Sequence, residues 1–383
     1  MTILYIIKSF AMRAGVERIM SDKMNYLAEK GHQIILVTYE QGEHALSFPL
    51  HQTIQHFDLN TRFFTLMKYG LPRRAFEFIL LSHTFKKRLQ KVIDTTQPDI
   101  ISTTTYSLNL VGIILQINTH AKRIIESHVN YNSILKENDF KGKLLLQTIT
   151  RYYDNYLLNK VKKMDAFFAL TNGDAKQWAP YAKKLYVIPN PVTLYPATIK
   201  DHTKTLHRII GAGRLDPQKG FDLLIESFSC IANQCSEWHI DIFGNGNEEQ
   251  KLRKIITEKK LDKQIFIHPA SDYIYEEFQN SDFFVFSSRY EGWGLVLVEA
   301  MSCGIPAVSF QCDYGPEDIL TDHYDGLLAE NGNIQDMANK ILWMIQNPQE
   351  RIKMGQAARD SAQRYKKTVI LEKWLYILQS LVT

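Results

Sequence analysis

The sequence has few cysteines, and their spacing excludes two common roles. The four cysteines of the 383-residue chain stand at positions 230, 235, 303 and 312, and none forms a Cys-x-x-Cys pair. Such a pattern fits neither a zinc finger nor the disulfide framework of a small secreted domain. We therefore expect free thiols in a reducing compartment, the cytoplasm.

Long apolar runs and strong charge are also missing. No stretch approaches the roughly 18 apolar residues that cross a bilayer. The apolar start at residues 2–8 is too short for a signal peptide, and no small-residue cleavage pattern follows it. A net charge of +4, without zinc-finger spacing or an Arg-rich tail, gives no reason to expect nucleic acid as a partner.

The length and composition indicate an ordinary globular protein with more than one core. Hydrophobic residues make up 45% of the chain and charged residues 22%, with no low-complexity tract. A chain of this length fits two domains of about 190 residues each.

Strands and helices alternate in the first half. An apolar strand at 3–7 is followed by a glycine-containing loop, a helix at 16–30 that ends at Gly31, and a second strand at 32–38. This is the βαβ start of a doubly wound parallel sheet. Further strands are predicted at 100–103, 123–127, 166–170 and 185–188. The first domain is predicted over 1–190.

The second half repeats the alternation after a proline-containing stretch. Residues 189–206 carry three prolines and no periodicity, which predicts a linker. The second α/β domain is predicted over 205–365, and a final helix over 366–383 has Trp374 and Leu378 to bury. The strands of the second domain are predicted at 208–213, 239–243, 264–268, 282–288 and 306–310.

One strand-to-helix connection in the second half carries a carboxylate in a glycine-rich turn and a second one in the helix that follows. From the end of the strand at 282–288 into a helix at 295–302, the chain reads Arg-Tyr-Glu-Gly-Trp-Gly-Leu-Val-Leu-Val-Glu from 289 to 299. Glycines let the backbone approach a ligand closely, and amides at a helix N-terminus face an anion. The strand places Glu291 in the loop, and the carboxylate of Glu299 offers two hydrogen-bond acceptors for vicinal hydroxyls. This layout suits a nucleotide sugar.

A second loop carries two cations. Gly-Ala-Gly-Arg-Leu-Asp-Pro-Gln-Lys-Gly at 211–220 joins the first strand of the second domain to the next helix. Glycines such as Gly213 admit phosphate oxygens there, and Arg214 and Lys219 add positive charge. In isolation, both loops could also be ordinary strand-to-helix connections with solvated charges.

Together the two loops resemble the motifs of retaining glycosyltransferases with the GT-B fold, family 4. The resemblance implies two facing Rossmann-like domains with a cleft between them, the first for the acceptor and the second for the donor. The final helix would return to the first domain.

The resemblance also implies roles for these loops. Glu291 would contact the hydroxyls of the donor sugar and Glu299 its ribose, while Arg214 and Lys219 would bind the diphosphate. Glycosyltransferases that hold the diphosphate with a divalent metal usually show Asp-x-Asp, which is absent here, so fixed cations would replace a metal ion. The amides that would hold the sugar and phosphate belong to Gly292, Trp293, Gly294 and Leu295, beside Gly213 on the other loop.

In the first half the resemblance rests on two short segments. Ala-Gly-Val-Glu-Arg at 14–18 resembles the glycine-rich turn of the family, usually Gly-Gly, so Gly15 would let a phosphate or the acceptor approach. A plain helix entry is the alternative. His128 follows a strand, where the family commonly places a histidine that hydrogen-bonds the donor sugar and supports charge near its anomeric carbon. A lone histidine is otherwise more often a satisfied structural residue.

Two further segments bear on the donor. Gly-Asn-Gly at 244–246 lacks the third glycine of a dinucleotide fingerprint and favours a tight structural turn. The segment 310–328 resembles members that build bacterial surface glycans from UDP-sugars, which implies transfer of a hexosyl or N-acetylhexosaminyl unit to a glycan or lipid-linked acceptor, without a cofactor. A GDP-mannose-dependent mannosyltransferase, a UDP-sugar epimerase of the same fold and a non-catalytic binding protein are the alternatives.

The stretch 61–91 combines basic and apolar side chains. It holds eight basic residues against one acid, interleaved with Phe, Leu, Met and Tyr. Such a surface suits an anionic membrane leaflet, which would place the protein peripherally at the inner face of the cell membrane. A core-packed helix with a solvated basic face is the alternative.

Overall fold

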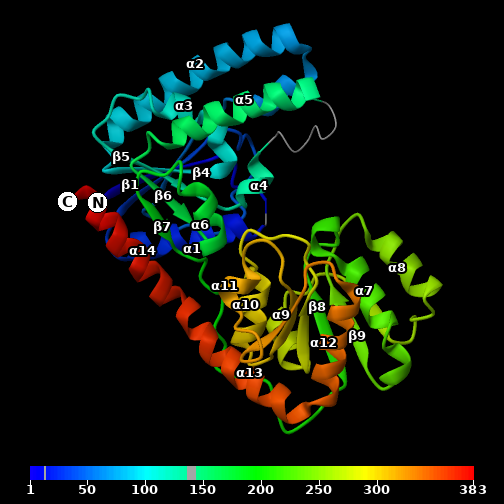
Figure 1. The fold of residues 1–383 in the computed structure, drawn as a ribbon. Coiled ribbons are helices and arrows are strands. Elements are labelled where there is room, and N and C mark those ends of the chain that lie inside the picture. The colour runs from blue at the N-terminus through cyan, green and yellow to red at the C-terminus, as the bar shows by residue number, and fades with distance from the viewer. Residues whose placement is uncertain (13, 136–143) are drawn as a thin grey trace. The chain divides into compact units, whose positions relative to one another are not determined.

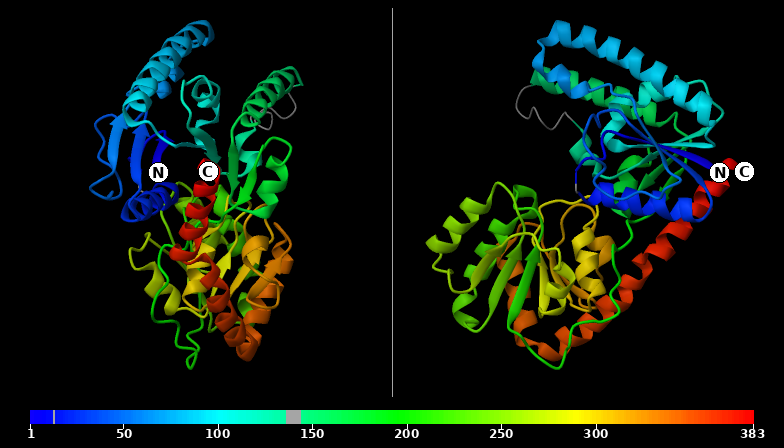
Figure 2. Two further views of the ribbon diagram at one scale, coloured as in Figure 1. Left: turned by 90° about the vertical axis from the view of Figure 1, so that its left-hand side faces the viewer. Right: turned by 180° about the vertical axis from the view of Figure 1, so that it is seen from behind.

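The computed structural model describes residues 1–12, 14–135 and 144–383, which form two compact units of α/β type (Figures 1 and 2). The first unit consists of Met1–Ile188 and Leu371–Thr383, and the second of Pro189–Ile370. Within the described residues, no helix is both long and apolar enough to span a membrane.

The described residues of the first unit form a seven-stranded parallel sheet in the order β3-β2-β1-β4-β5-β6-β7. Its inner strands are mostly buried because helices cover both faces of the sheet, with α2, α3 and α5 on one side and α1 and α14 on the other (Figure 1). The strands are β1 (Thr2–Ile7), β2 (Gln33–Thr38), β3 (Gln55–Asp58), β4 (Ile100–Thr104), β5 (Lys122–Glu126), β6 (Ala166–Ala169) and β7 (Leu185–Val187). The helices are α1 (Gly15–Glu29), α2 (Leu71–Thr96), α3 (Val111–Ile114), α4 (Tyr131–Ile134), α5 (Leu144–Val161), α6 (Asn172–Trp178) and the last helix α14 (Lys367–Val382), with 3-10 turns η1 (Phe63–Lys68) and η2 (Thr105–Leu110).

The second unit has a six-stranded parallel sheet in the order β10-β9-β8-β11-β12-β13. Its core joins β8, β9 and β11 to α7 and α12 through buried aliphatic and aromatic side chains. The strands are β8 (Arg208–Ala212), β9 (His239–Phe243), β10 (Ile265–His268), β11 (Phe283–Phe286), β12 (Ala307–Phe310) and β13 (Gly326–Ala329). The helices are α7 (Phe221–Ser229), α8 (Glu249–Glu258), α9 (Ile274–Gln279), α10 (Leu295–Ser302), α11 (Pro316–Ile319), α12 (Ile334–Gln346) and α13 (Pro348–Ala362).

Each sheet reverses its strand order at one place. The reversal lies between β1 and β4 in the first unit and between β8 and β11 in the second. In open parallel sheets, ligands bind at the carboxyl ends of the strands beside such a reversal. The loops after β8 and β11 are the two that carry the predicted cations and carboxylates.

The last helix supplies a buried aromatic to the first unit. The Trp374 ring lies on Phe168 of β6, with ring centroids 4.1 Å apart. Lys373 Nζ donates to the Val187 carbonyl at the end of β7, 3.2 Å away. The residues from 371 onward therefore belong to the first unit rather than to the second.

The segment 189–206, predicted as a linker, packs on the second unit. The Val192 amide donates to the Tyr365 carbonyl at 2.8 Å, and Arg359 Nη2 donates to the Pro196 carbonyl at 2.6 Å. Lys200 is buried and pairs with Asp282 at 3.2 Å. The segment lacks helix and strand, as its prolines predict, but tertiary hydrogen bonds hold several of its backbone groups.

The predicted α/β fold is confirmed in both halves, and two strands were missed. β3 is a four-residue edge strand with largely exposed side chains, Gln-His-Phe-Asp, which gives no apolar run. β13 is only Gly-Leu-Leu-Ala and opens with a glycine. Both are recognisable only from their pairing with β2 and β12.

Candidate active site

The second unit brings together an acidic and a basic residue from the two predicted loops. Lys219 Nζ lies 2.6 Å from Glu291 Oε1. The two side chains are only 15% and 8% exposed, so they are not the solvated loop charges of the alternative interpretation. A charge-assisted hydrogen bond in a partly buried place fixes both groups in position.

Arg214 lies on the same loop but points its guanidinium into solvent. Its side chain is 72% exposed, and Nη2 lies 3.1 Å from Asp216 Oδ2 and 3.2 Å from Gln218 Oε1. The structure therefore places one of the two predicted cations beside Glu291 and the other at the rim of the loop. An exposed arginine remains able to reach an anion, because its side chain has several rotatable bonds.

The approach of the two loops depends on a glycine. Gly220 has a φ of +61° and begins α7, and a Cβ there would lie 2.1 Å from the Ser287 carbonyl oxygen after β11. The stem of Lys219 passes over Gly213, where a Cβ would lie 3.3 Å from two of its carbons. Larger residues would push the cationic loop away from the acidic one.

Further hydrogen bonds join the two loops, and sequence reasoning missed them. The Arg289 amide donates to the Gln218 carbonyl at 2.8 Å, and the Gln218 side-chain amide donates to the Tyr290 carbonyl at 3.0 Å. The Arg289 guanidinium holds both oxygens of Asp222, at 2.8 and 2.7 Å. Burial opposes ionisation of Asp222, but the hydrogen bonds and charge of Arg289 still bring its pKa below the usual value.

The predicted glycine-rich turn opens α10 as expected. Gly294 is the N-cap with a φ of +99°, and Gly292 and Leu295 are partly exposed. Trp293, in contrast, is buried, and its ring packs edge-on against Tyr365 with centroids 5.2 Å apart. Its indole is therefore part of the core, which leaves only its backbone amide for a ligand.

Glu299 lies further along α10, partly exposed and beside Tyr275. Burial, together with the negative charge of Glu299, raises the pKa of the Tyr275 hydroxyl. The Tyr275 hydroxyl accepts a hydrogen bond from the Leu194 amide at 3.0 Å, which holds the tyrosine in place. A neutral, positioned tyrosine therefore lies beside Glu299.

The turn at 244–246 has a packing role. A Cβ on Gly244 would lie 1.9 Å from the Gly213 carbonyl oxygen, and one on Gly246 would lie 2.2 Å from that of Leu215. Both glycines let the loop after β9 pass beneath the cationic loop. This favours the structural interpretation of the segment.

In the first unit, Gly15 is the first residue of α1 and is exposed. A Cβ there would meet no heavy atom within 4 Å, so packing does not demand a glycine. The neighbouring residue 13 lies outside the described residues. The role that the resemblance implies for Gly15 therefore stays a prediction.

His128 lies just after β5 and is not a satisfied structural histidine. Within the described residues, neither ring nitrogen has a hydrogen-bond partner, although the side chain is buried. Burial lowers its pKa to about 4, against the opposing effect of Glu126, whose carboxylate is 3.8 Å from Nε2. Burying a polar group without a hydrogen-bond partner costs free energy. A neutral imidazole here would therefore gain from a hydrogen bond to a polar group of a ligand.

A buried charge network that sequence reasoning missed lies next to His128. Lys23 of α1 forms an ion pair with Glu126 of β5, and their side chains are only 8% and 3% exposed. The Ser102 hydroxyl of β4 donates to Glu126 Oε1 at 2.5 Å, and Lys23 Nζ sits 3.8 Å from the centre of the Trp374 ring. The network joins α1, β4, β5 and α14 through side chains whose neighbours are far apart in sequence.

Comparisons with known proteins agree with this layout. The family described as Glycosyl transferases group 1 matches residues 198–361, and Glycosyltransferase Family 4 matches 13–194. The solved structure of TarM superposes with a TM-score of 0.77 at 17% identity over 98% of both chains. Sucrose-phosphate synthase from Thermosynechococcus elongatus gives 0.78 at 16% identity, over 99% of this chain and 98% of that one.

Two Rossmann-like α/β units of this kind define the GT-B fold. The chain belongs to the glycosyltransferases of group 1, and it is an enzyme of that class. An uncharacterized glycosyltransferase of Haemophilus influenzae is 25% identical over 98% of this chain and 99% of its own length. A poly(ribitol-phosphate) alpha-N-acetylglucosaminyltransferase of Staphylococcus aureus is 31% identical over 59% of this chain, which spans 46% of that relative's length.

Proposed function

We propose that the protein is a retaining, metal-independent glycosyltransferase. It moves a hexosyl or N-acetylhexosaminyl unit from a UDP-sugar to a glycan or lipid-linked acceptor during synthesis of surface polysaccharide or glycoconjugate. The observation that carries the proposal is the Lys219–Glu291 pair, 2.6 Å apart, between the two loops that flank the strand reversal of the second sheet.

The donor diphosphate would bind beside Lys219 and Arg214. When the bond between the anomeric carbon and the phosphate oxygen breaks, negative charge grows on the leaving diphosphate. Lys219 is held in place by Glu291, so its charge needs little reorganisation to stabilise that change. Arg214, exposed at the rim, would close on the outer phosphate oxygens.

The sugar and ribose would be held by carboxylates and amides. Glu291 accepts hydrogen bonds from the sugar hydroxyls and Glu299 from those of the ribose. Amides at the start of α10, contributed by residues 292–295, face the sugar and phosphate. Trp293 contributes through its backbone alone, because its ring is buried.

Retention would follow from attack on the same face that the diphosphate leaves. The acceptor oxygen bonds to the anomeric carbon, and its proton passes to the departing phosphate oxygen. His128, a neutral imidazole at neutral pH, would hydrogen-bond the donor sugar, while Gly15 would leave room for a phosphate or the acceptor at the start of α1.

Two comparisons favour UDP over GDP in the donor, and a third concerns the transferred sugar. TarM was solved with UDP, and the pneumococcal O-GlcNAc transferase GtfA with UDP and GlcNAc. The relative of Staphylococcus aureus is named for transfer of N-acetylglucosamine. These properties belong to those proteins and support the same donor class here.

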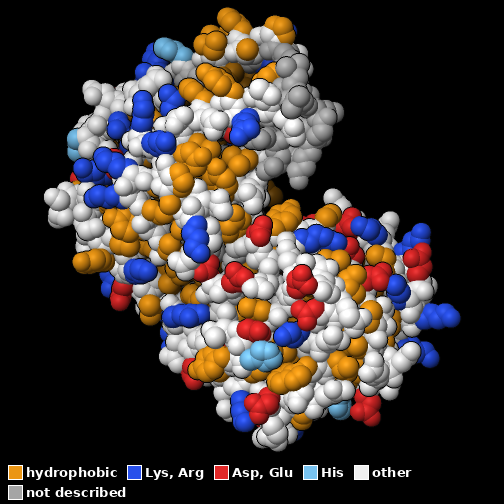
Figure 3. Space-filling view, viewed as in Figure 1, with side chains coloured by type: hydrophobic (Ala, Val, Ile, Leu, Met, Phe, Trp, Pro, Cys, Tyr) orange, Lys and Arg blue, Asp and Glu red, His pale blue; other side chains and the backbone are white. Residues whose placement is uncertain are grey.

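A peripheral position at the inner face of the cell membrane is part of the proposal. On α2, Phe76 and Ile79 are exposed together with Arg73 and Arg74. Figure 3 shows hydrophobic side chains next to Lys and Arg over this part of the first unit. Such a surface suits an anionic leaflet, where each basic residue adds about 1 kcal/mol.

Product analysis with a panel of donors tests the proposed function. The protein is incubated with UDP- and GDP-sugars, with and without EDTA, and nucleotide release and the anomeric configuration of the product are followed by NMR. We expect release of UDP, a retained configuration and no effect of EDTA. Conversion of a UDP-sugar to its epimer without nucleotide release would identify the epimerase alternative instead.

A further inference from the structure

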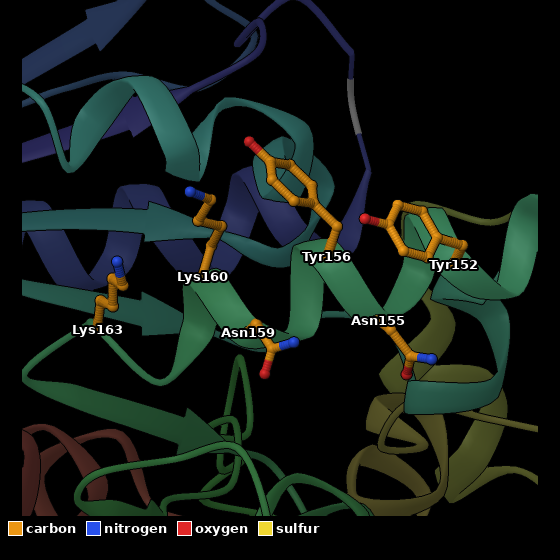
Figure 4. A pocket seen from close by; sticks show the side chains of 6 residues that line it. All are labelled: Tyr152, Asn155, Tyr156, Asn159, Lys160 and Lys163. Atoms are coloured by element: carbon orange, nitrogen blue, oxygen red, sulfur yellow. The ribbon is translucent and has the colours of Figure 1, made fainter.

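The outward face of α5 in the first unit carries a hollow that the proposed donor site does not use. Its volume is about 240 Å³, below the roughly 300–1,000 Å³ of pockets that enclose a drug-sized ligand. Figure 4 shows its lining in two rows along the helix. Tyr152, Tyr156, Lys160 and Lys163 form one edge, and Asn155 and Asn159 form the other.

The opposite face of α5 anchors the helix firmly. Leu157, Leu158 and Val161 are buried in the core that also contains Phe167 of β6 and Trp178 of α6. Residues three or four apart share a helix face, so the rows at 152, 156 and 160 and at 155 and 159 are presented on a fixed support. The hollow is therefore a built surface rather than the gap beside a loose loop.

The polar groups of the hollow are uncommitted. Within the described residues, neither Lys160 nor Lys163 forms an ion pair, and neither Asn155 nor Asn159 has a side-chain hydrogen bond. Tyr152 is 80% exposed and Tyr156 50%, which is unusual for such large aromatic rings. Amides, aromatic faces and free ammonium groups are thus all available to one ligand.

The charge of this face has one sign. Between 147 and 163 the sole acid is Asp154, and it is buried on the other side of the helix. Lys160 Nζ lies 4.8 Å from the centre of the Tyr156 ring, so a cation and an aromatic face are offered side by side. A ligand that complements the face carries anionic groups at intervals together with hydroxyls and C–H surfaces.

We propose that this face of α5 is a binding subsite for an extended anionic glycan, a section of the acceptor away from the point of transfer. Tyr152 and Tyr156 stack on sugar or polyol C–H surfaces. Asn155 and Asn159 form hydrogen bonds with hydroxyls, and Lys160 and Lys163 bind phosphate or carboxylate groups. The small hollow suits one residue of a chain that continues along the helix. The proposal rests on the proposed glycosyltransferase function and adds a charge requirement to its acceptor.

A lipid surface fits this face less well than it fits α2. Membrane-facing helices present Phe, Leu, Ile or Trp between basic residues, as α2 does with Phe76 and Ile79. The hollow instead offers two amides and two phenol hydroxyls. Amides gain nothing from hydrocarbon, whereas they bond well to hydroxyls.

Binding of defined oligosaccharides by calorimetry tests the subsite. The probes are a sulfated heparin oligosaccharide, a carboxylated hyaluronan oligosaccharide and a neutral dextran oligosaccharide of equal length. We expect the two anionic probes to bind, with an affinity that falls as salt is added, and dextran to bind much more weakly. Tyr152→Ala/Tyr156→Ala and Lys160→Ser/Lys163→Ser should each weaken anionic binding about tenfold or more, the factor that about 1.4 kcal/mol gives.

The controls separate this subsite from general attraction to a basic surface and from membrane binding. Tyr376→Ala, which removes an exposed tyrosine from α14, should leave anionic binding unchanged. Unchanged binding in both double variants overturns the proposal, and so does loss of binding to phosphatidylglycerol vesicles without loss of binding to the oligosaccharides. UDP binding, measured on the same proteins, should stay normal because its proposed site is in the second unit. Absence of UDP binding in the wild type would instead refute the donor site.

Discussion

Replacing Lys23 by methionine removes one partner of the buried network next to His128. Lys23 and Glu126 are 8% and 3% exposed, so the variant leaves a carboxylate in the interior without its ion pair. Breaking a buried pair in this way costs about 3–5 kcal/mol, because the remaining charge loses its compensation. The Ser102 hydroxyl still donates a hydrogen bond to Glu126, which reduces the loss of stability. The contact of Lys23 with the Trp374 ring is removed.

The assay is urea unfolding of wild type, Lys23→Met, Glu126→Gln and the double variant, followed by circular dichroism. We expect the double variant to lose much less stability than Lys23→Met, since it buries no unpaired charge. UDP binding should be nearly normal in all four proteins, because this network lies in the first unit. If Lys23→Met lost less than about 1 kcal/mol, or the double variant lost the sum of both singles, the network would not be a coupled buried pair.

Three further predictions follow from the geometry. Lys219→Ala should lower kcat/KM by about 10²-fold or more and Arg214→Ala by only about tenfold, because Lys219 holds Glu291 and, in the proposed function, also faces the diphosphate. Equal losses in steady-state kinetics would contradict this difference. The folded-state pKa of His128 is near 4, below the usual 6.5, so the unfolded chain binds the extra proton between these values. Stability should therefore fall as pH drops from about 6.5 to 4, by up to about 3 kcal/mol, and His128→Asn should flatten that part of the unfolding profile. Sedimentation with phosphatidylglycerol vesicles should need low salt and drop in Arg73→Ser/Arg74→Ser, and a wild type that ignores such vesicles would leave α2 an ordinary solvated helix.

The elements around the donor loops could be predicted because their signals are local. An apolar run, a glycine-rich turn and a stop at Gly304 define β11, the loop and α10 within a short stretch of chain. The residue types of the two loops also indicated a diphosphate and a sugar. The family resemblance implied that Lys219 and Glu291 would act on one ligand, but not that they contact each other.

The contacts that could not be predicted from the sequence are those between residues far apart in the chain. In the sequence, Lys23 cannot be told from a solvated lysine of an amphipathic helix. It is buried only because β5 and Trp374 pack against it in the folded chain. The Arg289–Asp222 pair joins a loop residue to the first turn of α7, 67 positions earlier in the chain, so neither local sequence reveals it. The position of Trp293 between two glycines likewise gave no sign that its ring packs on Tyr365.

The turnover of Glu291→Gln tests the central claim most directly. The substitution keeps the size of the side chain but removes the charge that faces Lys219 and, in the proposal, the acceptor of the donor sugar's hydrogen bonds. With a UDP-sugar donor and a glycan acceptor, we predict a folded protein that still binds UDP and whose turnover falls by about 10²-fold or more. Near-normal turnover in a folded, UDP-binding Glu291→Gln protein would contradict the assignment of this loop as the centre of the reaction.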